Sequence, residues 1–262
     1  MIFSNSNSYS QENEEFADWL FRNGFYDFAN YEYLKKLYLS ENENAILVAG
    51  LYNKIAKCYL MTERYDKGIK WCLAAIQNKQ GEVLPELYVT YALIQMHSGS
   101  YDESIAILND DRILKGEHRS RGLFLFGCSA AHKWELKRAD DYWDGIPSGD
   151  ALYLTASRYR YYTNEAADQR FLNQNLGTLL GVIPGLGYCY SGHYKTAISS
   201  FIVISLTSWA TYRAFDKDID GIGYLSGFLA VGWYSGSIYG SYWACKRHND
   251  FHKKQYLKKI RY

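Results

Sequence analysis

The chain has 262 residues, enough for one large domain or two small ones. Its 29 Lys and Arg against 28 Asp and Glu give a net charge of +1, which makes no overall electrostatic case for binding nucleic acid. A mean hydropathy of −0.34 excludes a protein that lies in the membrane throughout. Residues 176–262 hold 10 basic and 4 acidic residues, which leaves 19 and 24 for residues 1–175, so we expect two parts of different character.

Residues 1–15 are predicted to form a polar N-terminal segment. They contain neither the basic nor the apolar region of a signal peptide, so we expect none in the sequence as it stands. Their Ser/Asn run would also suit a segment just behind a cleavage site. The five cysteines have no metal or redox spacing and are expected to be small core residues. They are Cys58, Cys72, Cys128, Cys189 and Cys245.

Residues 16–147 contain a repeated helical pattern. In each of four segments a small residue is followed four positions later by a larger one, and an upstream helix carries a matching small residue that lets the two helices approach closely. The small residues are 39, 36 and 35 positions apart, close to the 34-residue tetratricopeptide period. The pairs are Ala29 and Tyr33, Gly68 and Cys72, Ser104 and Leu108, and Ala139 and Trp143, with Ala17, Ala56, Ala92 and Gly127 upstream.

This pattern resembles a stack of tetratricopeptide repeats, and a generic helical solenoid is the alternative. The first helices of such pairs line a concave face, which indicates a groove for a protein or peptide partner; an ordinary solvated face is the other interpretation. His97 and His132 recur one repeat apart, but no third ligand accompanies them, so no metal site is predicted. The candidate partner-binding residues are Asp18, Arg22, Asn53, Lys57, Met61, Met96, His97 and His132.

After a predicted connecting helix at residues 148–175, residues 176–246 are predicted to form a transmembrane hairpin. Residues 196–212 and 221–245 are charge-free stretches of 17 and 25 residues, and about 20 residues span a bilayer as a helix. Gly232, Gly236 and Gly240 are spaced by four and share one helical face, as do Gly223 and Gly227. This GxxxG-type seam favours close packing within the hairpin or a homo-oligomer. A soluble pair of buried helices is the alternative.

A Pro/Gly-rich stretch precedes the first of these helices and is predicted to be re-entrant, because Pro184 and its neighbouring glycines interrupt a helix. With Gly185, Gly187 and Gly192 it resembles the PGLGQxYxG pattern of bacterial envelope proteins that carry repeats before a short hydrophobic hairpin. In that pattern Tyr188 stands in place of Gln. The second helix resembles the WYxGNIYG ending of the same proteins, with Ser237 in place of Asn. The resemblance implies an envelope protein and no defined activity.

The charges flanking the hairpin predict its orientation. Lys195 and a basic tail at residues 247–262 favour the cytoplasmic side, and the acidic loop at residues 216–220 the outer side. Two crossings then leave the repeats in the cytoplasm at the inner membrane, whereas the resemblance implies an exported repeat domain. Asp216, Asp218 and Asp220 open like a calcium loop, but Gly227 stands where its last ligand should be, so a topology-marking loop is the favoured interpretation.

We therefore expect an all-α protein: a tetratricopeptide-like helical solenoid followed by a two-helix transmembrane hairpin. Its predicted function is a non-catalytic, membrane-anchored scaffold or adaptor that binds a protein or peptide partner and membrane lipids, with no cofactor and no nucleic acid. No catalytic motif with a recognised spacing is present, so an enzyme is not expected. The alternatives are an oligomerising membrane unit that aids assembly or transport of envelope components, and a soluble helical-repeat protein with a buried hairpin.

Overall fold

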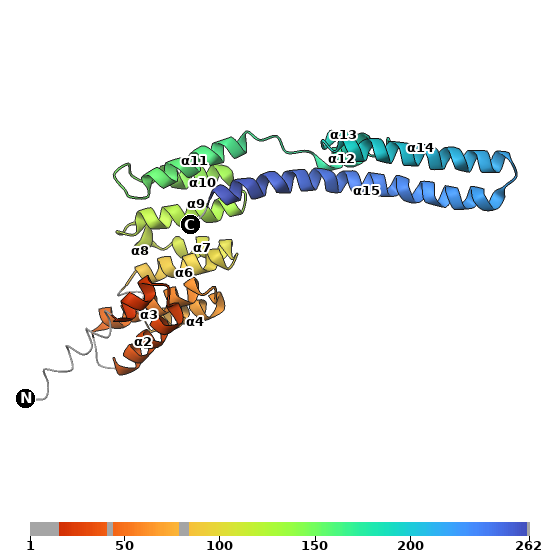
Figure 1. Cartoon of the computed structure of the whole chain (residues 1–262). Coiled ribbons are helices and arrows are strands. Elements are labelled where there is room, and N and C mark those ends of the chain that lie inside the picture. Colours follow the sequence, from red (N-terminus) through yellow and green to blue (C-terminus); the bar gives the residue numbers. More distant parts are fainter. Residues whose placement is uncertain (1–15, 41–43, 79–83, 261–262) are drawn as a thin grey trace, which may run out of the picture. The chain divides into compact units, whose positions relative to one another are not determined.

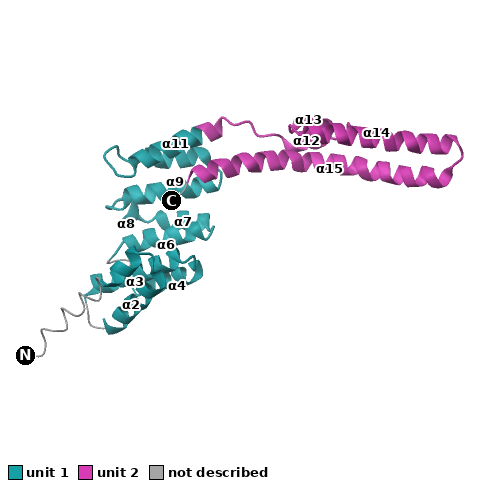
Figure 2. Ribbon diagram, viewed as in Figure 1, with its two compact units in different colours: residues 1–164, 262 teal, residues 165–261 magenta. Residues whose placement is uncertain are grey.

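The computed structural model describes residues 16–40, 44–78 and 84–260, and within these ranges every regular element is a helix. The predicted all-α class is therefore confirmed. The helices are labelled along the chain in Figure 1. The chain divides between Asn164 and Glu165 into two units (Figure 2), and this division lies inside the predicted connecting segment 148–175. The predicted polar segment 1–15 lies outside the described residues.

The first unit is a series of helix pairs in which each pair packs on the next, so the predicted helical repeat is confirmed. A helix at residues 16–22 pairs with α2, α3 with α4, α6 with α7, and α9 with α10. The short helix α8 is inserted between the third and fourth pairs, and α11 follows the last. The bounds are Tyr26–Leu39 (α2), Ala45–Met61 (α3), Tyr65–Gln77 (α4), Glu86–His97 (α6), Tyr101–Leu108 (α7), Asp111–Leu114 (α8), Arg119–His132 (α9), Leu136–Asp144 (α10) and Tyr153–Ala167 (α11).

One turn geometry joins the two helices of all four pairs. Three residues separate the two helices of each pair, and the central one has a left-handed backbone. These central residues are Gly24, Glu63, Gly99 and Trp134. The amide of the next residue donates to the carbonyl five positions back at 2.9 Å in every case, which closes the preceding helix. Each small residue of the predicted frame stands five positions after the left-handed residue and is buried.

The small residues permit close helix contacts, as the sequence pattern predicts. A Cβ atom at Gly127 of α9 would lie 2.2 Å from Nε1 of Trp143 in α10, so only glycine fits there. The indole occupies this space because its Nε1 donates to the carbonyl of Phe124 at 3.1 Å. Trp143 also contacts Tyr159 of α11 edge-on, with ring centroids 5.5 Å apart. The helix that was predicted to connect the two parts thus packs on the last repeat.

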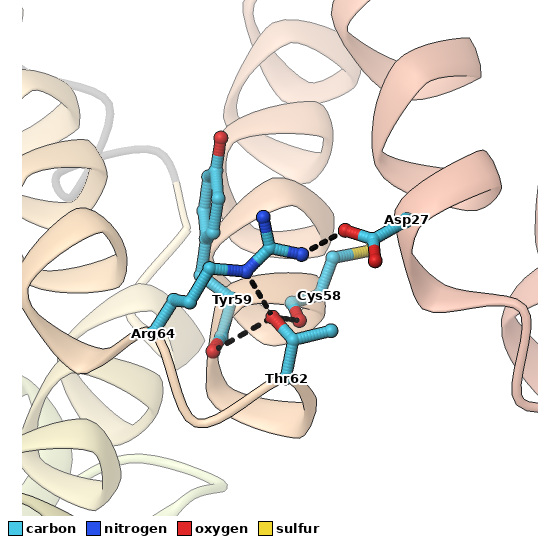
Figure 3. A network of polar contacts seen from close by, with 5 residues as sticks. All are labelled: Asp27, Cys58, Tyr59, Thr62 and Arg64. Atoms are coloured by element: carbon cyan, nitrogen blue, oxygen red, sulfur yellow. Dashed lines mark hydrogen bonds and ion pairs between the residues drawn. The ribbon is translucent and has the colours of Figure 1, made fainter.

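Polar contacts fix the first two repeats to one another (Figure 3). Nε of Arg64, the residue before α4, donates to Oγ1 of Thr62 at 3.1 Å, and its guanidinium also bonds to Asp27 in the first turn of α2. Thr62 in turn donates to the carbonyl of Cys58 at 2.9 Å. The guanidinium lies over the ring of Tyr59, 5.6 Å from its centroid. One arginine therefore connects α2, the end of α3 and the start of α4.

The second unit is a helical hairpin with two short helices packed at its base. These are α12 (Gln174–Leu180) and α13 (Leu186–Tyr190), and the hairpin is formed by α14 (Tyr194–Asp216) and α15 (Asp220–Lys259). The backbone breaks around Pro184, where Gly185 is left-handed. The turn that joins α14 to α15 repeats the geometry of the first unit, with Asp218 left-handed and the buried Gly223 five positions later.

One boundary in this unit differs from the expected one, and the predicted spanning helices are not confirmed. Residues 247–262 were predicted to be a separate basic tail, but α15 is continuous to Lys259, because no Pro or Gly follows Gly240 and the intervening residues tolerate a helix. The predicted spanning helices are also not identified as such: none of the helices in the described ranges is both long and apolar enough to cross a bilayer.

Candidate functional site

The predicted partner-binding face of the repeats carries a row of ion pairs between successive first helices. Asp18 pairs with Lys54 of α3 at 2.9 Å and accepts a hydrogen bond of 2.5 Å from the buried Tyr33. Lys57 of α3 pairs with Glu86 of α6 at 3.0 Å, and Glu86 also accepts from Arg121 of α9 at 3.3 Å. Asp18 and Lys57 thus hold neighbouring repeats together through their side chains.

The electrostatics of Glu86 reflect this bridging position. Burial raises the pKa of its carboxyl, but the positive charges of Lys57 and Arg121 outweigh burial and hold the pKa below its usual value of 4.5. The carboxylate is therefore charged at neutral pH and forms ion pairs with Lys57 and Arg121 at the same time.

Other predicted groove residues are distributed differently. Asn53 and Met96 are buried, 4% and 7% exposed, so neither is a groove residue; their positions on the helix turn them toward the neighbouring helices. The Oδ1 atom of Asn53 has no hydrogen-bond partner among the described residues. Arg22 remains on the surface, where its Nε donates to the carbonyl of Asp18 at 3.3 Å, and Met61 is exposed.

His97 and His132 occupy equivalent positions, as the sequence predicts. Each ends the first helix of its pair and stacks on the tyrosine that begins the second helix of the preceding pair. The ring centroids are 6.2 Å apart for His97 and Tyr65 and 4.9 Å for His132 and Tyr101. Burial and the charge of His132 lower the pKa of His97, so His97 is neutral at pH 7. The two histidines are components of the joint between repeats.

A polar depression of about 560 Å³ lies beside His97. Its wall combines three basic side chains with two acidic ones, so it has no strong preference for either sign of charge. The charged lining residues are Arg64, Lys67, Lys70, Glu63 and Asp66.

In the second unit, the two long helices meet through small and hydroxyl-bearing residues. Oγ of Ser200 donates to Oγ of Ser237 at 2.9 Å, and Oγ1 of Thr211 donates to Oγ of Ser226 at 3.0 Å, which fixes an antiparallel register. The inward positions of α14 recur in steps of three and four, as in a coiled coil. All but Ile204 are small or carry a hydroxyl: Ala197, Ser200, Ile204, Thr207, Thr211 and Ala214. On α15, Ser237 lies against Ser200, and Ser226 and Gly227 lie against Thr211.

The large apolar side chains of the same helices point outward. Phe228 is 78% exposed and Val231 68% exposed, and both lie in the charge-free part of α15. The hairpin is therefore small inside and bulky outside, the reverse of a soluble coiled coil. We call the following exposed residues the outer layer: Ile198, Phe201, Ile202, Leu206, Trp209 and Tyr212 of α14, and Ile222, Tyr224, Leu225, Phe228, Leu229, Val231, Trp233 and Tyr239 of α15.

The predicted glycine seam does not join the two helices of the hairpin. A Cβ atom at Gly232 or Gly236 would have no neighbour within 4 Å, whereas one at Gly240 would lie 1.8 Å from the hydroxyl of Tyr188 in α13. Of the glycines with this spacing, Gly223 and Gly227 lie against α14, next to Phe215 and Thr211. Helical spacing places Gly232, Gly236 and Gly240 on one face of the helix, but it does not show which neighbouring helix that face contacts.

The Pro/Gly motif packs against both α14 and α15. A Cβ atom at Gly185 would lie 2.4 Å from the carbonyl oxygen of Ala197, and one at Gly187 would lie 2.3 Å from Oγ of Ser241. Gly192 is left-handed in the turn before α14, and Pro184 lies in the break between α12 and α13. These residues build the base of the hairpin.

Two further glycines at this base escaped the sequence analysis. Gly177 lies in α12 and Gly181 directly follows its last residue, and Cβ atoms there would lie 2.4 Å from Sγ of Cys245 and 3.0 Å from Oγ of Ser241. Their four-residue spacing is the same GxxxG signal that we assigned to Gly232 and Gly236. It was present in the sequence, ahead of the Pro/Gly motif.

A groove of about 510 Å³ opens along one side of the hairpin. Gly232 and Gly236 form part of its wall, which explains why a Cβ atom at either position would meet no neighbour. The remaining lining residues are Tyr188 of α13, Thr196, Ser199, Ser200 and Val203 of α14, and Phe228, Leu229, Trp233 and Ser237 of α15.

The other candidate chemical groups do not converge. Asp216 pairs with Arg213 at 2.9 Å, and no three His, Cys, Asp or Glu residues in the described part of the chain lie close enough to hold a metal ion. Burial raises the pKa of Cys58 and of Cys72 to about 12, so these thiols are not nucleophiles at neutral pH.

Comparison of the chain with protein-family models, curated protein sequences and solved structures gives no match. The resemblance to repeat-bearing envelope proteins therefore stays a prediction.

Proposed function

We propose that this protein is a non-catalytic scaffold whose repeats, of tetratricopeptide type, bind a protein or peptide partner, and whose hairpin holds that partner at the bacterial inner membrane. The observation that carries the proposal is the reversed hairpin, with small residues between α14 and α15 and the outer layer exposed. Helices in lipid associate through small residues, because bulky apolar side chains gain nothing by leaving the lipid. Soluble monomers rarely expose a continuous apolar surface of this kind.

The dimensions and charges of the hairpin agree with this role. At 1.5 Å per residue the charge-free stretches are about 26 Å (residues 196–212) and about 38 Å (residues 221–245) long, against about 30 Å of hydrocarbon. The inward Ser, Thr and Gly residues lower the average hydropathy of both helices without facing the lipid. The proposal therefore depends on the apolar side chains of the outer layer and not on the average hydropathy of the helices.

The repeats support the partner-binding part of the proposal through their regularity. Four identical turns and the inter-repeat ion pairs of Asp18, Lys57 and Glu86 make a stable surface of successive first helices. Such a surface suits an extended peptide or a helix. Arg22 and Met61 are the predicted binding residues that stay available on it.

The test is membrane retention of the full chain expressed in bacteria, followed by an alkaline carbonate wash. We expect the wild-type chain to stay with the membranes, and the double variant Phe228→Asp, Val231→Asp to be released, since each charge near the centre of a spanning helix costs about 2.5–3.5 kcal/mol. Leu154→Asp is the matched control, because Leu154 is an exposed apolar residue of α11 outside the hairpin. Release of the wild-type chain would contradict the proposal.

Protease treatment of intact spheroplasts then tests the side of the membrane. Protection of the repeats would agree with the positive flanks at Lys195 and Lys246 lying in the cytoplasm. Cleavage of the repeats would place them outside and overturn the predicted orientation.

A further inference from the structure

We propose that the groove between α14 and α15 binds one anionic phospholipid, with an acyl chain along the hairpin and the headgroup at the end where α14 begins. This inference rests on the proposed membrane location. Its basis is the distribution of polar groups along the groove and the position of the neighbouring charges.

The groove is polar at one end and apolar at the other. The hydrogen bond between Ser200 and Ser237 fixes which parts of the two helices lie side by side. Tyr188, Thr196 and Ser199 therefore line the end near the start of α14. Toward the turn at residues 217–219 the walls are apolar, formed by Val203, Phe228, Leu229 and Trp233. A gradient of this kind matches an amphiphile.

The floor of the groove leaves room for an acyl chain. No atom lies within 4 Å of a Cβ position at Gly232 or Gly236, and both residues face the groove. Neither glycine is needed for the contact between α14 and α15, which uses other positions. The empty space is thus independent of the packing that holds the hairpin together.

The charges near the polar end favour an anion. Lys195 precedes Thr196, and it forms no ion pair with another described residue. Lys246 and Arg247 follow on α15 beyond the same end, and Lys246 lies over the ring of Trp243 at 4.7 Å. The hydroxyl of Tyr188 makes no hydrogen bond within the described part of the chain and is free to donate to a phosphate or ester oxygen. A zwitterionic headgroup would use these cations less well.

The experiment reconstitutes the full chain into nanodiscs of mixed phosphatidylcholine and phosphatidylglycerol and measures retained lipid by native mass spectrometry. We expect one phosphatidylglycerol per chain. Gly236→Leu fills the groove without touching the hairpin contact and should abolish retention. Lys195→Gln should lower retention about fivefold, the factor for removing one lysine near an anionic headgroup, and its matched control Lys217→Gln at the opposite end should not.

Equal retention of both lipids, or retention that Gly236→Leu leaves unchanged, would overturn the lipid site. A lipid-free dimer that Gly236→Leu dissociates would also overturn it, and would assign the groove to a second copy of the chain. Flotation of the purified full chain with liposomes, without nanodiscs, separates this result from a failure of the proposed function. A chain that floats without selective lipid loses only the lipid site, whereas a chain that does not float contradicts both proposals.

Discussion

The side chain of Asn249 forms hydrogen bonds with both the backbone amide and the backbone carbonyl of Leu172. Its Nδ2 donates to the carbonyl of Leu172 at 2.9 Å, and its Oδ1 accepts from the amide of Leu172 at 2.9 Å. The asparagine is only 8% exposed. The segment that leads into α12 is thus fixed along the C-terminal part of α15.

Asn249→Ala should release this segment. The substitution removes both hydrogen bonds and leaves two partly buried backbone groups unpaired, a cost of about 2 kcal/mol. Hydrogen exchange of the full chain should show loss of protection at the Leu172 amide. Asp250→Ala changes the adjacent exposed residue of the same helix and should leave that protection intact. An amide that stays protected in Asn249→Ala would show that the pair does not hold the segment.

The glycines of the hairpin base should differ sharply in their tolerance of a methyl group. A Cβ atom at Gly187 would lie 2.3 Å from Oγ of Ser241 and 2.5 Å from the carbonyl oxygen of Gly177, so Gly187→Ala must displace α12 or α15. Overpacking of this kind costs about 1–3 kcal/mol. Gly232→Ala is the control: its methyl group meets nothing within 4 Å, and alanine favours a helix by about 1 kcal/mol.

Thermal unfolding of both variants in the same detergent distinguishes them. The expected order of midpoints is Gly187→Ala lowest, then wild type, with Gly232→Ala at or above wild type. A reversed order would mean that Gly232 and not Gly187 is the packed glycine, as the seam prediction had it.

The contrast between these glycines shows how far the sequence determines the fold. The repeats were predictable because their signals are local: a turn, a small residue five positions after its left-handed residue, and a larger residue four positions later. The face of a helix that meets its neighbour is set by contacts distant in sequence. Gly240 meets Tyr188, 52 residues earlier by number, and no periodicity within α15 contains that information.

The same reason explains the partner-binding face. Spacing placed Asn53 and Lys57 one turn apart on a helix, but only the packed structure shows that Asn53 is buried and that Lys57 reaches Glu86, 29 positions away. Charge marked residues 247–262 as a basic tail but carried no information on its structure, and the residues up to Lys259 are the end of α15, where Asn249 contacts Leu172. The Ser, Thr and Gly content of α14 and α15 indicated close helix packing. Only the structure shows which side chains lie between the two helices and which point outward.

The ion pairs between repeats predict a pH dependence of stability. The pKa of Glu86 is lowered in the folded chain, so its charged form stabilises the fold above the usual pKa of 4.5, and that contribution is lost as the pH falls through the lowered pKa. Thermal midpoints of the wild type should therefore fall between pH 6 and pH 3.

Glu86→Gln should make the loss of stability between pH 6 and pH 3 smaller. The expected difference is about 1 kcal/mol in the free energy of unfolding, for a partly exposed carboxylate with two basic partners. The variant is expected to be less stable than the wild type at pH 6 and close to it at pH 3. Glu103→Gln, at an exposed position of α7, should follow the wild-type curve. Parallel curves for Glu86→Gln and wild type would show that Lys57 and Arg121 do not stabilise the carboxylate.

Substitution by alanine should have opposite effects on stability at a glycine of the recurrent turn and at a glycine inside a helix. Gly99 is left-handed at φ 86°, and Gly50 lies within α3; a Cβ atom at either meets nothing within 4 Å. Gly99→Ala should therefore destabilise the chain by about 1 kcal/mol through backbone strain alone, and Gly50→Ala should stabilise it by a similar amount through helix propensity. The equivalent turns tolerate Glu63 and Trp134, so Gly99→Ala is expected to fold. Unfolding midpoints in denaturant measure both changes, and destabilisation by both substitutions would mean that contacts, and not backbone conformation, select glycine in these repeats.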